Sequence, residues 1–420
     1  MKNNKEVPAI RFANFSEAWE KRQFSDVFIG LQNNTLSRAD LNYDNGEIKN
    51  VHYGDVLIKF GDYIDADSAE LPYINDSSIG SKFAKSLLED GDIIIADTAE
   101  DETVGKCCEI TNSNGMKLLS GLHTIAVRPQ QKYASKFLGY YLNSNAYHSQ
   151  LLPFMHGIKV TSISKGSLQD TVLTVPTSRD EQGKIGECLS NIDNLITLHQ
   201  NKLEKMQQVR ELLLNQLFTG LGQKFPDVRF TGNQEEWKLM SLRNIVTSYT
   251  DYVPTPTDGY TRLGIRSHMK GTFYDYVAPS KKLGEKRLQR VKRDNLIVNI
   301  VFAWEHAVAV TTEEDEGKLV SHRFPQFSFN EGMYPMFFRY ALSDPRFRHH
   351  LFLASPSGAG RNKTLRIDEM MDYQLSVPEY EEQKKIAGCL ETVDHLIGLY
   401  EMELEKIRNV KSACLQGMFV

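Results

Sequence analysis

The sequence predicts an α+β protein built as a tandem duplication, in which two mixed α/β globular domains alternate with two long helices. Two observations predict this fold class. A heptad pattern over residues 182–218 returns over residues 383–419, and a short signature of Pro, Arg, Phe and Trp opens each half of the chain. The predicted order is a domain at 1–176, a helical segment at 177–222, a domain at 223–378 and a helical segment at 379–420.

Both helical segments carry apolar residues at spacings that alternate between four and three, which is the seam of a left-handed coiled coil. A shift of 201 residues superimposes the copies, and 15 of 37 aligned positions are identical. Neither segment contains Pro, so each is expected to form a helix of about 35 residues and roughly 50 Å. The apolar seam residues are Ile185, Leu189, Ile192, Ile196, Leu203, Met206 and Leu213, and Ile386, Leu390, Val393, Ile397, Leu404, Ile407 and Met418.

A heptad helix with a single apolar stripe is not stable alone in water, so each copy must pack on something. It could pack on its own domain, or the two copies could pack on each other. Matched lengths and matched seams favour the second arrangement, an antiparallel coiled coil with pseudo-two-fold symmetry. The seam is polar at equivalent places, first at His199 and Tyr400 and then at Arg210 and Lys411.

The domains repeat as well. Pro8 to Phe12 and Trp19 correspond to Pro226 to Phe230 and Trp237, at a constant offset of 218 residues. This second repeated signature makes the whole chain a duplication and not two similar helices by chance.

Within the domains, short runs of apolar and β-branched residues at 55–60, 92–96 and 296–302 predict strands. Aromatic clusters that follow, around residues 137–142 and 337–342, are expected to be helical and to lie in the core. Each domain then closes with a strand that ends in Val-Pro, where proline stops the strand and the long helix begins.

The composition is that of a cytoplasmic protein without a membrane span. The N-terminus has no apolar signal segment and no apolar run reaches 18 residues. Five cysteines, with no CxxC pair, favour neither a disulfide framework nor a zinc site.

The net charge of −5 by itself disfavours nucleic-acid binding, but the charge is unevenly distributed. Residues 40–109 hold 17 acids, whereas residues 115–170 hold six Lys or Arg against one acid. Residues 259–294 hold ten Lys or Arg against three acids, and residues 321–366 hold seven against two. Each half therefore carries a basic segment before its helix, which is either a solvated face or a phosphate-binding surface.

A polar loop lies in each basic segment, at 157–165 in the first half and at 357–364 in the second. Both are rich in Ser, Thr, Lys, Arg, Asn or Gly, which can donate to phosphates and reach base edges. The two loops hardly resemble each other although the sequence around them does. This contrast is typical of one architecture that reads two different things.

No catalytic signature is present. The sequence lacks a phosphate-binding G-x-x-x-x-G-K-[ST] loop, a dinucleotide fingerprint, a nucleophile elbow, an H-E-x-x-H pair and the Asn/Asp-Pro-Pro-aromatic motif of base methylation. We therefore expect no catalytic centre, no metal and no cofactor in this chain.

The repeated Pro-x-x-Arg-Phe and Trp signatures, the Val-Pro exits and the two heptad helices together resemble the specificity subunit of type I restriction-modification systems, over almost the whole chain. The resemblance implies two target-recognition domains that each read half of a bipartite double-stranded DNA sequence, and helices that set the spacer and dock two modification subunits. The partner subunits would use S-adenosylmethionine to methylate adenine, and restriction subunits would use ATP and Mg for translocation and cleavage. The chain itself would not be an enzyme.

On this interpretation, polar and basic residues of the loops and basic segments are candidate DNA contacts, and the acidic residues 40–109 are expected to face away from DNA or toward a partner. A helical scaffold that binds proteins but no DNA, and an enzyme with an unrecognised centre, remain the alternatives. The candidate contacts are Lys159, Thr161, Ser162 and Lys165 in the first half and Arg262, Arg266, Lys270, Arg361, Asn362, Lys363 and Arg366 in the second.

Overall fold

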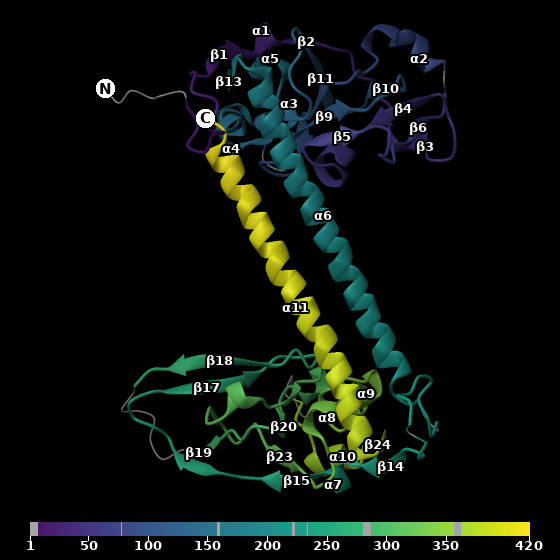
Figure 1. Ribbon diagram of the computed structural model, residues 1–420, viewed down its shortest axis with the longest axis vertical. Coiled ribbons are helices and arrows are strands. Elements are labelled where there is room, and N and C mark those ends of the chain that lie inside the picture. Colours follow the sequence, from purple (N-terminus) through teal and green to yellow (C-terminus); the bar gives the residue numbers. More distant parts are fainter. Residues whose placement is uncertain are drawn as a thin grey trace. The chain divides into compact units, whose positions relative to one another are not determined.

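The chain forms two compact units in the computed structural model (Figure 1). Unit 1 comprises residues 1–201 with 401–420, and unit 2 comprises residues 202–400. The structure describes residues 7–76, 78–157, 160–220, 223–232, 234–279, 287–356 and 363–420. Two 38-residue helices, α6 (Arg179–Gln216) and α11 (Tyr380–Gly417), each contribute one part to unit 1 and one part to unit 2.

Unit 1 is a mixed α/β domain with a five-stranded sheet of order β2-β11-β7-β9-β5 and a four-stranded sheet of order β10-β4-β6-β3. Its strands are β1 (Glu20–Gln23), β2 (Phe28–Gly30), β3 (Leu41–Asn42), β4 (Ile48–Val51), β5 (Tyr63–Asp65), β6 (Tyr73–Ile74), β7 (Ile93–Ala96), β8 (Thr98–Ala99), β9 (Cys107–Thr111), β10 (Lys117–Ser120), β11 (Thr124–Pro129), β12 (Thr161–Ser162) and β13 (Val172–Val175). Its helices are α1 (Phe24–Val27), α2 (Ile79–Lys82), α3 (Phe137–Asn143), α4 (Asn145–His148) and α5 (Lys165–Gln169), with the short turns η1 (Arg38–Asp40), η2 (Asp55–Lys59), η3 (Ala84–Ser86) and η4 (Leu152–Phe154).

The core of unit 1 lies between α3, the five-stranded sheet and the ends of the long helices. The predicted strand at 92–96 is confirmed as β7, whose four residues are all buried, as expected of a central strand. The predicted core aromatics are also confirmed, since Phe137 and Tyr141 of α3 are fully buried. Phe419, directly after α11, packs its ring 6.1 Å from Phe137 and 6.5 Å from Trp19. The C-terminal end of the chain is therefore part of the core of unit 1.

The predicted strand at 55–60 is wrong, because Asp55–Lys59 forms the helical turn η2. Asp55 and Val56 are buried whereas Ile58 is 89% exposed, so the run lacks the alternating burial of a half-buried strand. The Arg38 guanidinium donates to both carboxylate oxygens of Asp55 at 2.8 and 3.0 Å, and this pair fixes the turn.

Unit 2 has the same general plan, with a four-stranded sheet of order β15-β23-β20-β21 and a five-stranded sheet of order β16-β19-β22-β17-β18. Its strands are β14 (Lys238–Ser241), β15 (Val246–Tyr249), β16 (Tyr252–Pro254), β17 (Tyr260–Ile265), β18 (Thr272–Val277), β19 (Arg287–Arg290), β20 (Asn295–Val298), β21 (Val308–Val310), β22 (Leu319–Val320), β23 (Gln326–Phe329) and β24 (Gln374–Val377). Its shorter helices are α7 (Leu242–Ile245), α8 (Pro335–Ala341), α9 (Pro345–Leu353) and α10 (Ile367–Met371), with the turns η5 (Ala303–Glu305) and η6 (Glu313–Asp315).

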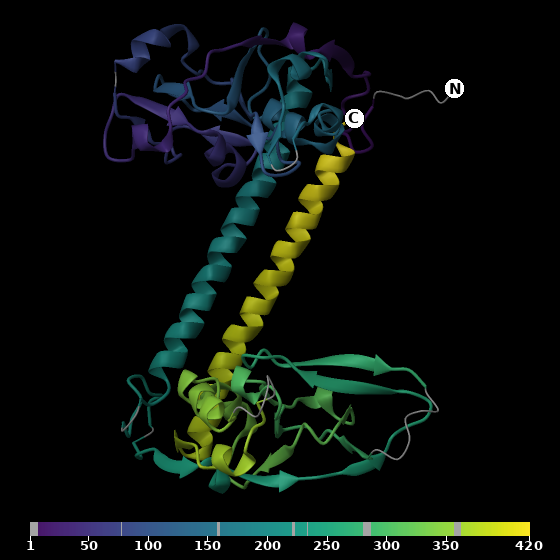
Figure 2. The ribbon, with the colours of Figure 1, turned by 180° about the vertical axis from the view of Figure 1, so that it is seen from behind.

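The core of unit 2 repeats that of unit 1. Phe337 and Phe338 of α8 are fully buried, and Phe218, which follows α6, packs 5.4 Å from the Phe337 ring and 6.4 Å from that of Trp237. In both units a two-stranded ribbon, β1–β13 or β14–β24, joins the first strand after the Trp to the Val-Pro strand before the long helix. Figure 2 shows the strands β17 and β18 of unit 2 running side by side as a long hairpin.

The predicted strand at 296–302 is shorter than expected, because β20 ends at Val298. The Asn299 side chain accepts the N–H of Val301 at 3.1 Å, which turns the backbone out of the sheet. The following residues Ala303–Glu305 form η5, which lies against α9.

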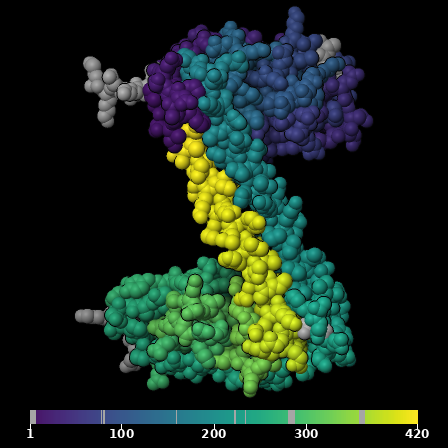
Figure 3. Space-filling view, viewed as in Figure 1, coloured from purple at the N-terminus to yellow at the C-terminus, as the bar shows by residue number. Residues whose placement is uncertain are grey.

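The two long helices pack on each other antiparallel within each unit (Figure 3). In unit 1 the start of α6 lies beside the end of α11, and in unit 2 the end of α6 lies beside the start of α11. Every seam position is buried or half-buried. Ile185 and Leu189 also belong to the core of unit 1, and Ile386 and Leu390 to that of unit 2. Both packing alternatives are thus realised, and the predicted fold class is confirmed.

The polar seam residues bind carboxylates of the facing helix. In unit 1 the Lys411 ammonium lies 2.7 Å from Asp193 and 3.1 Å from Asp62. In unit 2 the Arg210 guanidinium donates to Asp394 at 2.5 Å. A tyrosine hydroxyl of the neighbouring domain donates to the same helix carboxylate, Tyr140 to Asp193 at 2.6 Å and Tyr340 to Asp394 at 2.9 Å. These two clusters, which we call the polar anchors, tie each domain to the helix pair.

The repeated opening signature docks on the start of the long helices. The Arg11 guanidinium donates to both oxygens of the buried Glu181 at 2.6 and 2.8 Å, and Arg229 does the same with Glu382 at 2.7 and 2.8 Å. Bidentate pairs of this kind fix orientation as well as distance. The signature therefore repeats because it holds the N-terminal strand of each domain to its helix.

Candidate nucleic-acid interface

The candidate contacts of unit 1 gather on a short ribbon beside the five-stranded sheet. Thr161 and Ser162 form β12, which pairs antiparallel with β8, and Ser162 is exposed. The next residue, Ile163, is buried and anchors the ribbon. Lys159 lies outside the described residues.

Lys165 is exposed at the first position of α5, and Ser164 caps this helix by accepting the Ser167 N–H at 3.0 Å. Its ammonium lies over the backbone of Gly30, so close that a Cβ there would collide with it. The Lys165 side chain thus turns toward the end of β2. Thr161, Ser162 and Lys165 present two hydroxyls and one cation on one edge of unit 1.

Part of the acidic stretch lies beside these residues. Glu100, Asp101 and Glu102 are exposed and follow β8, the strand that pairs with β12. The acidic residues of this turn therefore lie next to candidate contacts of unit 1, an arrangement that charge counts cannot reveal because the paired strands are about 60 residues apart. The edge of unit 1 combines hydroxyl donors with carboxylate acceptors.

The candidate contacts of unit 2 lie on the β17–β18 hairpin and around η5. Arg262 of β17 is exposed and paired with Asp275 of β18 at 2.9 Å. At the end of the same strand Arg266 donates to the Thr272 carbonyl, and its guanidinium lies 5.4 Å from the centre of the Phe273 ring. Lys270 is exposed in the turn between the strands.

This turn docks directly on η5. The N–H of His268 donates to the Glu305 carbonyl at 2.9 Å, and that of Met269 donates to the His306 carbonyl at 3.0 Å. Two candidate cations, Arg266 and Lys270, are thereby held next to η5.

A second stretch reaches η5 from the other side. The Lys363 ammonium lies 4.0 Å from the centre of the Phe352 ring and 4.9 Å from that of Trp304. Arg366 is exposed and pairs with Glu369 at 2.7 Å. Arg361 and Asn362 lie outside the described residues. The structure thus places Lys363 and the pair Arg266 and Lys270, which precede it by more than 90 residues, around η5. It leaves Arg262 out along the hairpin.

Sequence reasoning missed the aromatic residues among these cations. Phe302 is 47% exposed and Phe352 is 46% exposed, while Trp304 is half-buried. Clustered aromatic residues are expected from the sequence to lie in the core. The one local indication that Phe302 and Trp304 lie outside a strand is Asn299 just before them, a residue type that favours turns. A group of exposed aromatic side chains is stronger evidence for a binding surface than a single exposed Leu.

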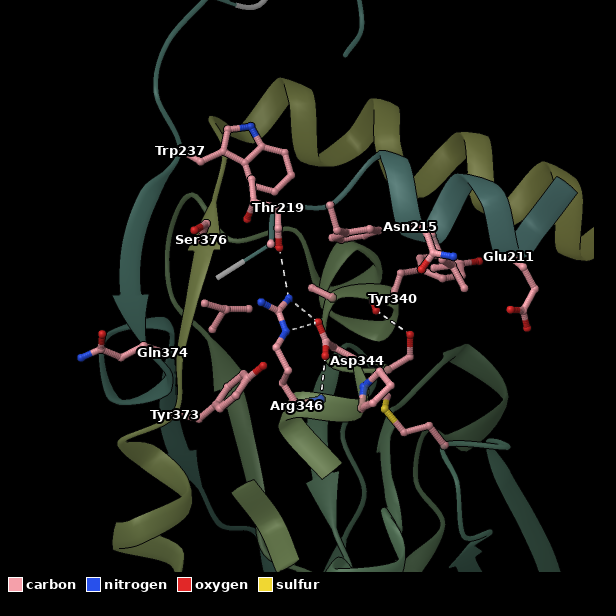
Figure 4. Close-up of a pocket in the computed structure, with 18 of the residues that line it drawn as sticks. Glu211, Asn215, Thr219, Trp237, Tyr340, Asp344, Arg346, Tyr373, Gln374 and Ser376 are labelled. Carbon is pink, nitrogen blue, oxygen red and sulfur yellow. Dashed lines mark hydrogen bonds and ion pairs between the residues drawn. The ribbon is translucent and has the colours of Figure 1, made fainter. Parts of the chain in front are cut away.

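A pocket of about 440 Å³ opens in unit 2 between the end of α6, β14, β24 and the start of α9 (Figure 4). Arg346 reaches across it, donating to the carboxylate of Asp344 and to the Thr219 carbonyl at 3.1 Å. Burial raises the pKa of both Tyr340 and Tyr373 on its wall, so these phenols stay protonated. The polar groups labelled in Figure 4 form no pair of nucleophile and base, and the arrangement fits a structural support for the end of α6.

Among the described residues no cluster of three or more His, Cys, Asp or Glu has the geometry to hold a metal ion. No helix in the described part of the chain is both long and apolar enough to cross a membrane.

Residues 16–208 match the family model of the type I restriction modification DNA specificity domain. The chain is 21% identical over 421 residues to a putative type I restriction enzyme MjaX specificity subunit of Methanocaldococcus jannaschii, covering 94% of this chain and 91% of the relative. It is 23% identical over 270 residues to the type I restriction enzyme MjaVIII specificity subunit of the same organism, covering 61% and 63%.

A crystal structure of a type I restriction-modification S subunit from M. genitalium has the same fold, with a TM-score of 0.58, 12% sequence identity and 99% coverage of both chains. The family model covers the first domain with most of α6, and the repeated signature and polar anchors extend the same plan to the second half. Residues 16–208 therefore carry a type I restriction modification DNA specificity domain, and the chain is similar over most of its length to specificity subunits of type I restriction-modification systems.

Proposed function

We propose that each domain of this specificity subunit, residues 1–176 and 223–378, reads one half of a bipartite DNA target. The proposal rests on one observation: the contacts that tie each domain to the helices are the same in both units, whereas the exposed candidate contacts differ. The polar anchors and the Arg–Glu pairs recur in both units with similar distances. The surfaces do not recur, since unit 1 offers hydroxyls and carboxylates and unit 2 offers cations around aromatics. Two half-sites of different sequence require such a combination.

The residue types suggest a division of roles. Lys165, Lys270 and Lys363 are point cations suited to phosphates, which set register without carrying sequence information. Thr161 and Ser162 can donate or accept at base edges, and the carboxylates after β8 can accept from the amino group of cytosine. Arg262 is already paired with Asp275, so we assign it to holding the hairpin in shape.

We assign the docking of two modification subunits, one per unit, to a second apolar stripe along the helices. Leu195, Leu198, Val209 and Leu212 of α6 are between 37% and 53% exposed. Each directly precedes a seam residue, and Leu396, Leu399 and Val410 repeat three of them on α11 with 37%, 37% and 52% exposure. The anchor carboxylates Asp193 and Asp394 each directly follow a seam residue, so the domains cover the opposite side of the helices.

Exposed apolar stripes with heptad spacing are suited to receive helices from another protein. The modification subunits would supply S-adenosylmethionine and methylate adenine, and restriction subunits would act with ATP and Mg. With two such sites, the helices would also fix the distance between the two half-sites.

The experiment on recognition is a map of methylated adenines in cells that express this chain with its modification subunit. We expect one bipartite, asymmetric motif that disappears without this chain. Thr161→Ala with Ser162→Ala should relax one half of the motif only, and Lys270→Ala with Lys363→Ala should lower occupancy without changing the bases read. Methylation that does not depend on the chain would favour the scaffold alternative, as would binding to duplex DNA that does not respond to salt.

The experiment on docking uses native mass spectrometry of the assembled complex. Leu195→Glu with Leu198→Glu should remove one modification subunit, and the same changes at Leu396 and Leu399 should remove the other. Asn194→Glu with Asn201→Glu, which adds the same charge to exposed polar positions beside the stripe and keeps its leucines, is the matched control. Retention of both subunits in the leucine variants would refute this assignment.

A further inference from the structure

Unit 2 carries an exposed group of aromatic side chains at the point where its candidate cations meet. We call Phe302, Trp304 and Phe352 the aromatic ridge. Phe302 and Phe352 are 47% and 46% exposed, and Leu353 beside them is 62% exposed. Leaving such large apolar side chains in water forgoes the stabilisation that their burial would give, so their exposure requires an explanation.

The ridge is held outward by its backbone. The Phe302 N–H donates to the Asn299 carbonyl at 3.1 Å, and the Phe302 carbonyl accepts the Glu305 N–H at 2.9 Å. The indole N–H of Trp304 donates to the Val301 carbonyl at 3.1 Å. Beneath the turn, Ala303 is fully buried, and on α9 the neighbours Phe347 and Leu351 are fully buried. The buried positions thus fix which side chains point out.

Positive charge surrounds the ridge. Lys363 lies over two of its rings, at 4.0 Å from Phe352 and 4.9 Å from Trp304. Arg266 and Lys270 lie in the turn that docks on η5, and Arg323 is exposed next to Ile300, whose N–H donates to the Arg323 carbonyl at 3.0 Å. The carboxylate of Glu305, within η5, accepts the Ser267 hydroxyl at 2.7 Å.

The combination of exposed rings and surrounding cations favours DNA over a protein as the partner of the aromatic ridge. An apolar protein surface packed on the rings would strip water from Lys363 without supplying a counter-charge, which is costly. DNA offers both a base face for the rings and phosphates for the cations, as in stacking platforms and in side chains inserted between base steps.

We propose that the aromatic ridge inserts against an unstacked base step in the half-site read by unit 2, an inference that rests on the proposed function. Ring stacking offsets the energy of opening that step, and Lys363, Arg266 and Lys270 hold the flanking phosphates. A locally opened duplex is also what extrusion of a target base requires.

The described residues of unit 1 show no counterpart of the ridge at the corresponding place. The corresponding connection, between β7 and β9, exposes Glu100, Asp101 and Glu102 instead. Carboxylates there repel phosphates and offer no ring for stacking. The inference therefore distinguishes the two half-sites, with distortion expected at one and not at the other.

The test uses the full chain assembled with its modification subunits and a duplex that carries the motif found by methylation mapping. The variant Phe302→Leu with Phe352→Leu keeps apolar bulk but removes the rings. We expect about 5- to 100-fold weaker binding for each stacked base lost. The control is Phe225→Leu, because Phe225 is also an exposed ring, 44% exposed, with the Arg229 guanidinium 5.5 Å from its centre.

A second readout reports stacking itself. 2-Aminopurine placed at successive positions should brighten on binding of the unaltered chain at one step of the half-site of unit 2, and at none in that of unit 1. A mismatched pair at that step should tighten binding of the unaltered chain but not of the ring-deleted variant.

If the ring-deleted variant binds with unchanged affinity and gives unchanged fluorescence, the proposed insertion of the aromatic ridge is refuted, while the proposed recognition of DNA is not. Equal losses in the Phe225 control would also overturn it. If the unaltered complex shows no affinity for the duplex, the proposed function fails and not only this inference.

Discussion

Lys411→Met is the substitution that tests the polar anchors most directly. The ammonium of Lys411 forms ion pairs with both Asp193 and Asp62 in unit 1. Burial alone would lower the pKa of Lys411, but the two carboxylates raise it above its ordinary value. The lysine is therefore charged at neutral pH, and methionine would leave two carboxylates without it.

The geometry sets the size of the effect. The side chains of Lys411, Asp193 and Asp62 are 21%, 27% and 14% exposed, so they are screened less than surface ions. Removal of one partner from a buried ion pair costs about 3–5 kcal/mol, and partial exposure places this case near about 3 kcal/mol. Arg210→Met in unit 2 orphans only Asp394, in a pair that is 33% and 26% exposed, and should cost about 1–2 kcal/mol.

Unit-resolved hydrogen exchange is the appropriate assay, because a chain with two units need not unfold in one step. Lys411→Met should lower protection of α3 and β9 in unit 1 and leave α8 in unit 2 unchanged. Arg210→Met should do the reverse with a smaller loss. Lys411→Met combined with Asp193→Asn should recover part of the protection. A loss for Arg210→Met equal to or larger than that for Lys411→Met would refute the reasoning.

The other predictions concern pH, charge and helix length. Burial raises the pKa of Glu109 to about 7, so the stability that this shift gives unit 1 is complete below about pH 4.5 and is lost as the pH rises through 7. Burial lowers the pKa of His306 to about 4, so unit 2 loses stability as the pH falls from about 6.5 through 4. Hydrogen exchange corrected for intrinsic rates should show these opposite trends, each up to about 3 kcal/mol, and Glu109→Gln and His306→Gln should flatten them. Arg361→Ala with Lys363→Ala should weaken salt-dependent DNA binding more than Lys159→Ala with Lys165→Ala, and equal losses in a salt titration would contradict the asymmetry. Seven residues inserted in both helices, after Asn201 and after Tyr400, should lengthen the preferred spacer in the methylation map without changing the half-sites, and an unchanged spacer would refute a measuring role for the helices.

The helices and the duplication could be predicted because both depend on local spacing. Period 3.5 identifies the seam, and a constant offset identifies the repeat, without knowledge of tertiary structure. Polar residues at Arg210 and Lys411 were visible as interruptions, but their meaning was not. The partners of Lys411 come from Asp193 and from Asp62, which is 349 residues away. Nothing in a linear pattern specifies such a contact.

The surfaces were harder to predict for a related reason. Phe302 is exposed because the backbone turns after Asn299, and Phe352 is exposed because the opposite face of α9 is buried. Both features depend on tertiary structure and cannot be read from local sequence. The run at 55–60 had the composition of a strand, yet the Arg38–Asp55 pair folded it into a turn. Candidate cations were found by residue type, but only the docking of the 266–270 turn on η5 showed which of them gather.

The polar anchors also explain why a seam that could be wholly apolar is not. A buried polar position costs stability and in return specifies register, because any slip leaves charges unpaired. Here each anchor joins both long helices to the domain, so that a heptad slip of α11 against α6 would separate Lys411 from Asp62 of the domain as well as from Asp193 of the helix. An apolar seam would tolerate that slip, since Leu and Ile would again meet Leu and Ile. Because both units carry an anchor at equivalent positions, the register of the helix pair is fixed within each unit.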